Sequence, residues 1–156
     1  MTRQINAAGL KLIKQQEGLR LTTYLDVGGL SSVGYGHRTS LPVGTSITLD
    51  QANEWLRKDL ISVEGAIEGR VNVKLTDNQF AALVSFAYNV GIGSFWTSIL
   101  LAKLNQSEYD AVTSEFFKWI HVHGVISSGL LARRYAEAQL WIAKDAEIPK
   151  SATIAA

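Results

Sequence analysis

The chain has 156 residues, 47% of them hydrophobic, which is enough for one domain to bury a core of its own. Its formal net charge is +1, so charge alone predicts no nucleic-acid partner, and the lack of cysteine excludes disulfides, thiolate metal sites and thiol redox chemistry. The N-terminal residues lack the apolar core of a secretory signal, and polar residues and glycines interrupt the most apolar stretch, 80–96, so we expect neither an export signal nor a membrane-spanning helix.

The first 47 residues divide into a helix and a glycine-rich strand region. Apolar residues recur among lysines and glutamines over 6–17, which predicts a helix that ends at Gly18 and carries Glu17 on its last turn. From 21 to 46 the sequence changes to strand-forming threonine, tyrosine and valine residues, separated by glycines and by Pro42. We therefore expect a small antiparallel sheet or hairpin in this part of the chain.

The rest of the chain is predicted to be helical. Thr48 and Thr76 each begin a capping-box pattern that ends in glutamine three residues later, which indicates one helix to about Gly69 and another over 80–90. The second helix is apolar on nearly every face and is expected in the middle of a bundle. Further helices are expected at 98–105, 108–119 and 129–144, followed by a frayed tail from 149.

This order of elements predicts a mostly helical α+β protein in a single domain, without internal repeats. A small antiparallel β lobe, at about 18–47, would face a larger helical lobe formed by about 70–148 together with the N-terminal helix. Two lobes of this kind leave a cleft between them, where ligands preferentially bind. We therefore expect a ligand site between the lobes.

Two carboxylates and a hydroxyl belong to the junction of the first helix and the strands. Hydrolysis of a glycosidic bond needs one carboxyl that donates a proton to the leaving oxygen and a second that activates water or stabilises positive charge on the sugar. Apolar walls at a helix end would raise the pKa of Glu17, and an open glycine-rich hairpin would leave Asp26 ionised. Ser32 could hold the attacking water from the opposite strand. A glutamate at a helix end and an aspartate in a turn are also common structural residues, so their spacing leaves both readings open.

A longer pattern around these residues resembles a known catalytic signature. Residues 17–37 read E-G-L-R-L-x-x-Y-x-D-x-x-G-x-x-S-x-G-Y-G-H, which is similar to the signature of the phage-type lysozymes, the endolysins of tailed bacteriophages. The likeness continues through T-x-x-Q-x-x-A-L-x-S-F-x-Y-N-x-G at 76–91 and, more loosely, through G-L-x-x-R-R-x-x-E at 129–137. It therefore covers almost the whole chain.

The resemblance implies a single lysozyme-like catalytic domain over 1–156 that hydrolyses the β-1,4 bond between N-acetylmuramic acid and N-acetylglucosamine in peptidoglycan, without a metal or an organic cofactor. Carried over by position, Glu17 is the general acid, Asp26 its carboxylate partner and Ser32 the third member. The resemblance also implies accumulation in the host cytoplasm and access to the wall, in the periplasm, through a membrane lesion made by a holin, with host lysis as the result. We expect a monomer that acts on peptidoglycan, with no nucleic-acid partner and no stable membrane association.

Position 32 departs from the family, which usually has threonine there. Serine keeps the hydroxyl but lacks the methyl group that restricts χ1, so the oxygen of Ser32 is aimed less firmly. We expect activity to survive this change, although it could be reduced. Strand alternation places the neighbouring Ser31 on the opposite face. The fixed distance to Gly34-x-Gly36-His37 identifies Ser32 as the family position.

Two further polar positions are expected to support the site. His37 could act as a general base, but at the end of a glycine-rich strand we expect it to make structural hydrogen bonds, and the resemblance implies the same supporting role. Arg133 and Arg134 could bind phosphate, but an ion pair with Glu137 on the same helix is the favoured interpretation. One of the two arginines, with Arg133 expected in the supporting role, could instead reach Glu17.

Aromatic residues and the remaining histidines carry weaker indications. The tryptophans are expected in the core more often than as platforms for sugars. By resemblance, the end of the helix at 80–90 faces the cleft, where Tyr88 and Asn89 would bind substrate, Asn89 by a hydrogen bond to an N-acetyl group. His121 and His123 have the spacing of a strand-borne metal pair, but no third ligand lies nearby in the sequence, so we expect no metal site.

Three alternative functions remain open at this point. A lytic transglycosylase cuts the same bond with an anhydro product and typically needs only the glutamate, so the presence of Asp26 disfavours it. A non-catalytic peptidoglycan-binding module on the same scaffold is disfavoured because both carboxylates are present. A nucleic-acid-binding protein is disfavoured by the weak net charge.

Overall fold

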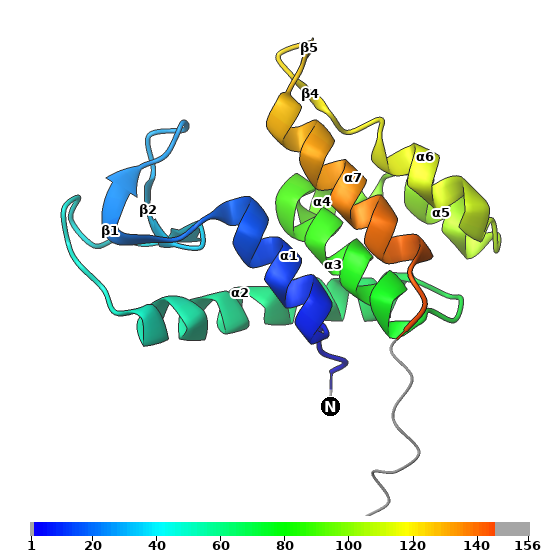
Figure 1. The fold of residues 1–156 in the computed structure, drawn as a ribbon, viewed down its shortest axis with the longest axis horizontal. Coiled ribbons are helices and arrows are strands. Elements are labelled where there is room, and N and C mark those ends of the chain that lie inside the picture. The colour runs from blue at the N-terminus through cyan, green and yellow to red at the C-terminus, as the bar shows by residue number, and fades with distance from the viewer. Residues whose placement is uncertain (1, 146–156) are drawn as a thin grey trace, which may run out of the picture.

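The structure, a computed structural model that describes residues 2–145, has a small β-containing lobe on one side and a group of helices on the other, connected by the long helix α2 (Figure 1). The helical segments are α1 (Ala7–Glu17), α2 (Leu49–Arg70), α3 (Asp77–Val90), α4 (Ile92–Trp96), α5 (Ile99–Asn105), the 3₁₀ turn η1 (Tyr109–Ala111), α6 (Val112–Phe116) and α7 (Ser128–Ile142). The strands are β1 (Arg20–Leu25), β2 (Ser31–Gly34), β3 (His37–Arg38), β4 (His121–Val122) and β5 (Val125–Ile126). Within the described residues, no helix combines the length and the apolar character needed to cross a bilayer.

Helix α1 begins and ends as the sequence predicts. The side chain of Asn6 accepts a hydrogen bond from the backbone N–H of Gly9 at 2.9 Å and so caps the first turn. Gly18 follows the helix with a φ of +70°, a conformation that glycine adopts without strain because it has no Cβ. Glu17 therefore lies at the junction between the helix and the first strand.

The predicted antiparallel sheet is confirmed, with the strand order β1-β2-β3. The register places Ser32 of β2 opposite both Tyr24 of β1 and Arg38 of β3. Val33, the next residue of β2, is fully buried, and both β2 and β3 lie against α2. The small lobe is therefore held against the helices by the first half of α2.

Helix α3 is the centre of the helical lobe. Thr76 and Gln79 form the predicted capping box: the hydroxyl of Thr76 accepts from the N–H of Gln79 at 3.1 Å, and the Gln79 side chain accepts from the N–H of Thr76 at 3.0 Å. The residues from 80 to 87 are all buried, because α3 packs against α1, α2, α4 and α7 (Figure 1). The apolar sequence of this helix correctly predicts its central position.

Two stretches differ from the sequence prediction. Residues 108–119 do not form one helix, because η1 precedes α6 and α6 ends at Phe116. The amides of Lys118 and Trp119 donate to carbonyls three residues earlier, at 3.3 and 3.0 Å, and this tighter winding ends the α-helix. The short helix α4 follows Gly91, where the glycines predict only an interruption. The predicted frayed tail lies outside the described residues.

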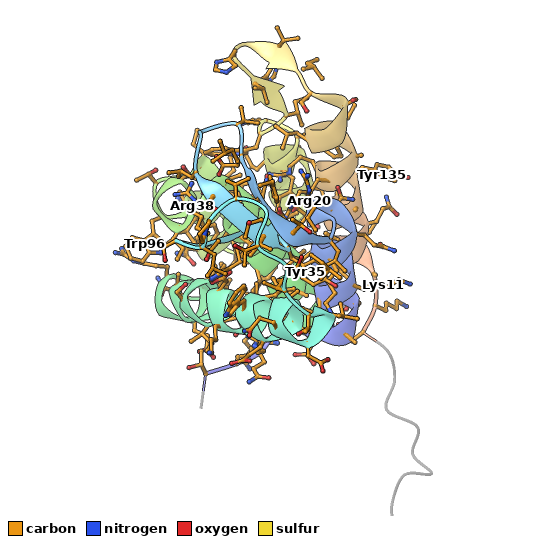
Figure 2. All side chains as sticks on the ribbon, turned by 90° about the vertical axis from the view of Figure 1, so that its left-hand side faces the viewer. Lys11, Arg20, Tyr35, Arg38, Trp96 and Tyr135 are labelled. Atoms are coloured by element: carbon orange, nitrogen blue, oxygen red, sulfur yellow. The ribbon has the colours of Figure 1, made fainter. Side chains whose placement is uncertain are left out.

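The tryptophans occupy several environments. Trp141 is buried in the core, as predicted, whereas Trp55 and Trp119 are half-buried. Trp96 is 42% exposed on the outer flank of the molecule, where the guanidinium of Arg70 lies 4.3 Å from its ring centroid (Figure 2). The core prediction is therefore wrong for Trp96.

Candidate active site

A cleft of about 640 Å³ lies between the small lobe and the helices, within the usual size range of ligand sites. Side chains from both lobes line it, and most of them are polar or charged: Glu17, Asp26, Gly36, His37, Arg38, Asp59, Tyr88, Asn89, Val90 and Gly91. The cleft thus brings together the two carboxylates, the histidine and the tyrosine-asparagine pair that the sequence singles out from separate stretches.

Glu17 enters the cleft from the last turn of α1, with 22% of its side chain exposed. Its Oε1 accepts a hydrogen bond from Nη1 of Arg133 at 2.5 Å. A turn of the small lobe lies on the other side: a Cβ at Gly36 would be 3.4 Å from Oε2 of Glu17, and the φ of +83° at this position favours glycine. The prediction of apolar walls around Glu17 is wrong, since a guanidinium and a backbone turn flank the carboxylate.

Arg133 reaches Glu17 from α7 and is itself only 4% exposed. Its guanidinium also donates from Nε to Oε1 of Glu137 at 3.2 Å and from Nη2 to the carbonyl of Ser85, on α3, at 3.1 Å. The hydroxyl of Ser85 donates to the same oxygen of Glu137 at 2.8 Å. Arg133 therefore makes both of the ion pairs that the sequence offered as alternatives, with Glu137 and with Glu17.

Asp26 directly follows β1 and is held by a tight local turn. Its Oδ1 accepts from the backbone N–H of Leu30 at 2.9 Å, and its own N–H donates to the carbonyl of Leu30 at 2.8 Å. The Leu30 N–H is the main reason that the pKa of Asp26 is lowered; burial opposes the shift, while the N–H of Gly28, the hydroxyl of Ser32 and the charge of Arg38 support it. The expectation that this carboxyl stays ionised is confirmed in direction.

The two adjacent serines of β2 face opposite sides, as strand alternation predicts. Ser32 is buried, and its hydroxyl donates toward Oδ2 of Asp26 at 3.4 Å, a long hydrogen bond. The hydroxyl of Ser31 donates instead to the carbonyl of Leu41 at 3.0 Å. Ser32 thus stands behind Asp26, and its contact with the cleft runs through that carboxylate.

His37 connects β3 to α2. Its Nδ1 lies 2.8 Å from Oδ2 of Asp59, and its ring stacks on Trp55 with the centroids 4.7 Å apart and the planes inclined by 21°. Both partners belong to α2, so the histidine fixes the small lobe to the long helix. This arrangement agrees with the supporting role expected for His37.

Tyr88 reaches from α3 to the small lobe. Its hydroxyl donates at 3.1 Å to the carbonyl of Tyr35, in the turn between β2 and β3, which Figure 2 shows beside α1 and α2. Burial raises the pKa of the Tyr88 phenol, and the negative charge of Glu17 adds to the effect. The phenol therefore remains a proton donor well above neutral pH.

Asn89 is exposed at the end of α3 and lines the cleft. Its Oδ1 accepts a hydrogen bond from Nη2 of Arg134, which leaves the two N–H donors of the amide for other partners. Arg134 is fully buried on α7, with its guanidinium 5.0 Å from the ring centroid of Phe86. The two consecutive arginines thus hold different cleft residues, Arg133 the carboxylate and Arg134 the amide.

These same elements match a known protein family. Residues 14–137, from the second half of α1 to the second half of α7, match the family model described as phage lysozyme. The chain belongs to the phage lysozyme family. The match includes both cleft carboxylates and both arginines, so the family pattern covers every side of the site.

Individual relatives agree with this membership. The endolysin of Acyrthosiphon pisum secondary endosymbiont phage 1 is 41% identical over 88% of this chain and 97% of that relative. The endolysin of Bacillus phage PZA is 40% identical over 88% of this chain, which spans 55% of that longer relative. Among solved structures, the muramidase domain of SpmX from Asticaccaulis excentricus has a TM-score of 0.86 at 34% identity and covers 91% of this chain and 99% of that domain.

The structure of this phage lysozyme adds residues that sequence reasoning missed. Arg38 and Asp59 line the cleft, and Ser85 lies behind it on α3. Asp59 follows two basic residues in a helix, a pattern typical of a solvated face, and Ser85 stands in an apolar helix without other polar neighbours. Ser85 belongs to the family-like pattern at 76–91, but its role, like that of Asp59, follows from helix packing, which the local sequence does not specify.

The histidines at 121 and 123 lie apart from this cleft lining. His121 begins β4, and His123 occupies the turn of the β4–β5 hairpin with a φ of +49°. Both are exposed on the hairpin at the top of α7 in Figure 1. Over residues 2–145, no group of three or more His, Cys, Asp or Glu side chains is placed to hold a metal ion.

Proposed function

We propose that this phage lysozyme is an endolysin that hydrolyses the β-1,4 bond between N-acetylmuramic acid and N-acetylglucosamine in peptidoglycan. Family membership makes it a glycoside hydrolase of the lysozyme class. The observation that carries the specific proposal is that Glu17 and Asp26, from opposite lobes, line one cleft in contrasting surroundings. Hydrolysis of a glycosidic bond uses such a pair of carboxyl groups. Relatives named as endolysin and muramidase support the same substrate.

Glu17 is the general acid in this proposal. Arg133 occupies Oε1, so Oε2 is the oxygen that would carry the proton to the leaving glycosidic oxygen. A charge-assisted hydrogen bond to a buried guanidinium restricts rotation of the carboxyl group. Arg133 thus fixes one oxygen and leaves the other facing the substrate.

Asp26 is the carboxylate partner, and Ser32 is the third member. The lowered pKa keeps Asp26 ionised, so it could activate the attacking water or stabilise positive charge that develops on the sugar. Ser32 is buried behind Asp26 and donates its proton to that carboxylate, so in this proposal it acts on the attacking water by orienting Asp26.

Tyr88 and Asn89 form the substrate-binding side of the proposed site. The N–H donors of Asn89 that Arg134 leaves free could bind the carbonyl of an N-acetyl group. Tyr88 would form a wall of the cleft while its hydroxyl links the lobes. His37 and Arg133 support the site by holding β3 and Glu17 in place.

The wider functional context is also a proposal. We expect 1–156 to act as one catalytic domain, with lobes at about 18–47 and at about 70–148 plus the N-terminal helix, as a monomer and without a cofactor. The family resemblance supports accumulation in the host cytoplasm and passage to the wall through a holin lesion. Cells that express the chain should lyse only when a holin is co-expressed, and the purified protein should sediment as a monomer.

Mass spectrometry of the fragments released from purified peptidoglycan tests the reaction. Reducing N-acetylmuramic ends are the expected product of hydrolysis. Anhydro ends would instead identify a lytic transglycosylase, and the absence of fragments would identify a binding module. Folded Glu17→Gln protein, assayed in parallel, gives the background of the experiment.

A further inference from the structure

Glu137 is a fully buried carboxylate in the middle of α7. Its Oε1 accepts hydrogen bonds from the hydroxyl of Ser85 at 2.8 Å and from Nε of Arg133 at 3.2 Å. Its Oε2 lies 3.0 Å from Nε of Arg134, an ion pair without hydrogen-bond geometry. Burial of an unpaired charge would strongly destabilise the fold, so the buried carboxylate of Glu137 depends on these partners.

The two arginines depend on Glu137 to different degrees. Arg133 has further directional partners in the carbonyl of Ser85 and in Glu17. For Arg134, the described residues supply no hydrogen-bond acceptor at Nε or Nη1, and its directional bond is the one from Nη2 to Asn89. Burial lowers the pKa of Arg134, the charge of Glu137 opposes this effect, and the nearby Arg133 adds to it. Burial likewise raises the pKa of Glu137, and the charges of Arg134 and Arg133 oppose that effect, so the carboxylate and the two buried guanidinium groups stabilise one another's charged forms.

Both arginines connect Glu137 to the cleft. Arg133 holds Oε1 of Glu17, the acid of the proposed reaction, and Arg134 holds Oδ1 of Asn89, on the substrate-binding side. With Glu17 ionised, the two carboxylates and the two guanidinium groups sum to no net charge, and with the proton on Glu17 the group carries one positive charge. Removal of the central carboxylate would leave two buried positive charges next to each other. Arg133 would keep its bonds to Ser85 and Glu17, whereas Arg134 would be held, among the described residues, by its bond to Asn89 alone.

We infer that Glu137 is a positioning residue that fixes the general acid and the substrate-binding amide together, through Arg133 to Glu17 and through Arg134 to Asn89. The inference rests on the proposed function, since it assigns Glu17 and Asn89 the roles given above. It extends that function by making one buried carboxylate responsible for both proton delivery and substrate affinity.

Steady-state kinetics of Glu137→Gln on soluble peptidoglycan fragments test the inference. The amide has the same shape but no charge, so both guanidinium groups lose the ionic contact that orients them. We expect kcat to fall about tenfold or more, because a displaced acid delivers its proton poorly, and KM to rise about fivefold, because Asn89 loses its fixed orientation. Wild-type values of both constants would overturn the inference.

Glu115→Gln is the matched control. Glu115 is also buried, at 2% exposure, and also contacts two cations, Lys103 and Lys118, at 2.7 and 2.8 Å, but it lies on α6 away from the cleft lining. Its substitution should lower the melting temperature while leaving kcat and KM of the folded protein unchanged. If Glu137→Gln behaves in the same way, its role is structural and the inference is wrong.

Should Glu137→Gln fail to fold, Ser85→Ala tests the link from Glu137 to Arg133, and the pair Arg134→Lys and Asn89→Ala tests the link from Arg134 to Asn89. Ser85→Ala removes one hydrogen bond to Oε1 of Glu137 and should lower kcat with little change in KM. Arg134→Lys and Asn89→Ala should each raise KM, and their combination should raise it no further, because both act through one contact. Additive effects of the pair would contradict the proposed link.

Glu17→Gln separates this inference from the proposed function. Lysis by folded Glu17→Gln protein would remove the acid from the proposed reaction and the inference with it. An inactive Glu17→Gln protein together with unchanged kcat and KM in Glu137→Gln would leave the proposed function in place and overturn the inference alone.

Discussion

The two carboxylates of the cleft are held in opposite ways. Glu17 bonds to Arg133, a residue 116 positions away in sequence, which is itself fixed by buried groups of α3 and α7. Asp26 bonds to Leu30 and Ser32, which are four and six positions away. The first environment is charged and depends on helix packing, whereas the second is mostly backbone and comes with the turn itself.

This difference suits the two roles that the carboxylates have in the proposed reaction. A rigid ionic support fixes the direction in which Glu17 presents its free oxygen. Backbone N–H groups favour the charged form of Asp26 and keep it ionised. Damage to the helix packing should therefore disable the acid first, while damage to the small lobe should disable its partner.

The largest effect is expected at Glu17, the carboxylate that is held by the distant residue Arg133. Glu17→Gln should reduce wall lysis by about a thousandfold or more, within the range of about 10²–10⁴ that general acids contribute. The amide can still accept the bond from Arg133 but has no proton to deliver. Turbidity of a cell-wall suspension measures lysis, and circular dichroism checks the fold. Substantial lysis by the folded variant would assign the acid elsewhere.

A smaller but still large effect is expected at Asp26. Asp26→Asn should lower turnover by at least about a hundredfold, because it removes the charge and keeps the oxygen that accepts from Leu30. The rate of release of reducing ends from peptidoglycan measures the change. A variant that keeps most of its activity, with anhydro ends in its products, would instead support transglycosylation by Glu17 alone.

The part of the site that depends on contacts within a few residues, around Asp26, is its local half, and the sequence predicts this half well. The end of α1 at Gly18, the ionised state of Asp26 and the opposite faces of Ser31 and Ser32 all follow from neighbours within a few residues. Turn formation, capping and strand alternation act over this range, so the sequence contains the necessary information.

The long-range half is predicted only in part. The sequence suggests that an arginine at 133 or 134 could reach Glu17, but the direction of each side chain depends on how α7 crosses α3. For the same reason the sequence predicts an apolar wall at the place beside Glu17 where the structure has Arg133. Asp59 and the buried link through Ser85 likewise arise from packing between elements.

An intermediate effect is expected at Ser32, which tests the local half directly. Ser32→Ala removes the hydroxyl that contacts Asp26 and should lower turnover about tenfold or more, since a misplacement on the order of 1 Å can cost a hundredfold. Ser32→Thr restores the family's usual residue and should match or exceed the wild type, because the methyl group restricts χ1.

Ser31→Ala is the control for the Ser32 series. The Ser31 hydroxyl donates to the carbonyl of Leu41 on the opposite face, so its loss should leave turnover on purified peptidoglycan near the wild-type value. Equal turnover of Ser32→Ala and the wild type would remove Ser32 from the site and leave catalysis to Glu17 and Asp26.

The smallest expected effect is the contribution of Asp26 to stability in acid. Local hydrogen bonds, chiefly that from the N–H of Leu30, lower the pKa of Asp26 in the folded protein, so its ionised form stabilises the fold. This stabilisation is present above the unfolded value of 3.8 and is lost as the pH falls through the lower pKa of the folded state. Urea denaturation at a series of pH values should therefore show a steeper loss of unfolding free energy below pH 3.8 for the wild type than for Asp26→Asn.

The slope for Ser32→Ala should lie between those of the wild type and Asp26→Asn, because this variant loses one hydrogen bond to Asp26 and retains the dominant one from Leu30. Identical slopes for all three proteins would mean that the turn does not select the ionised carboxylate.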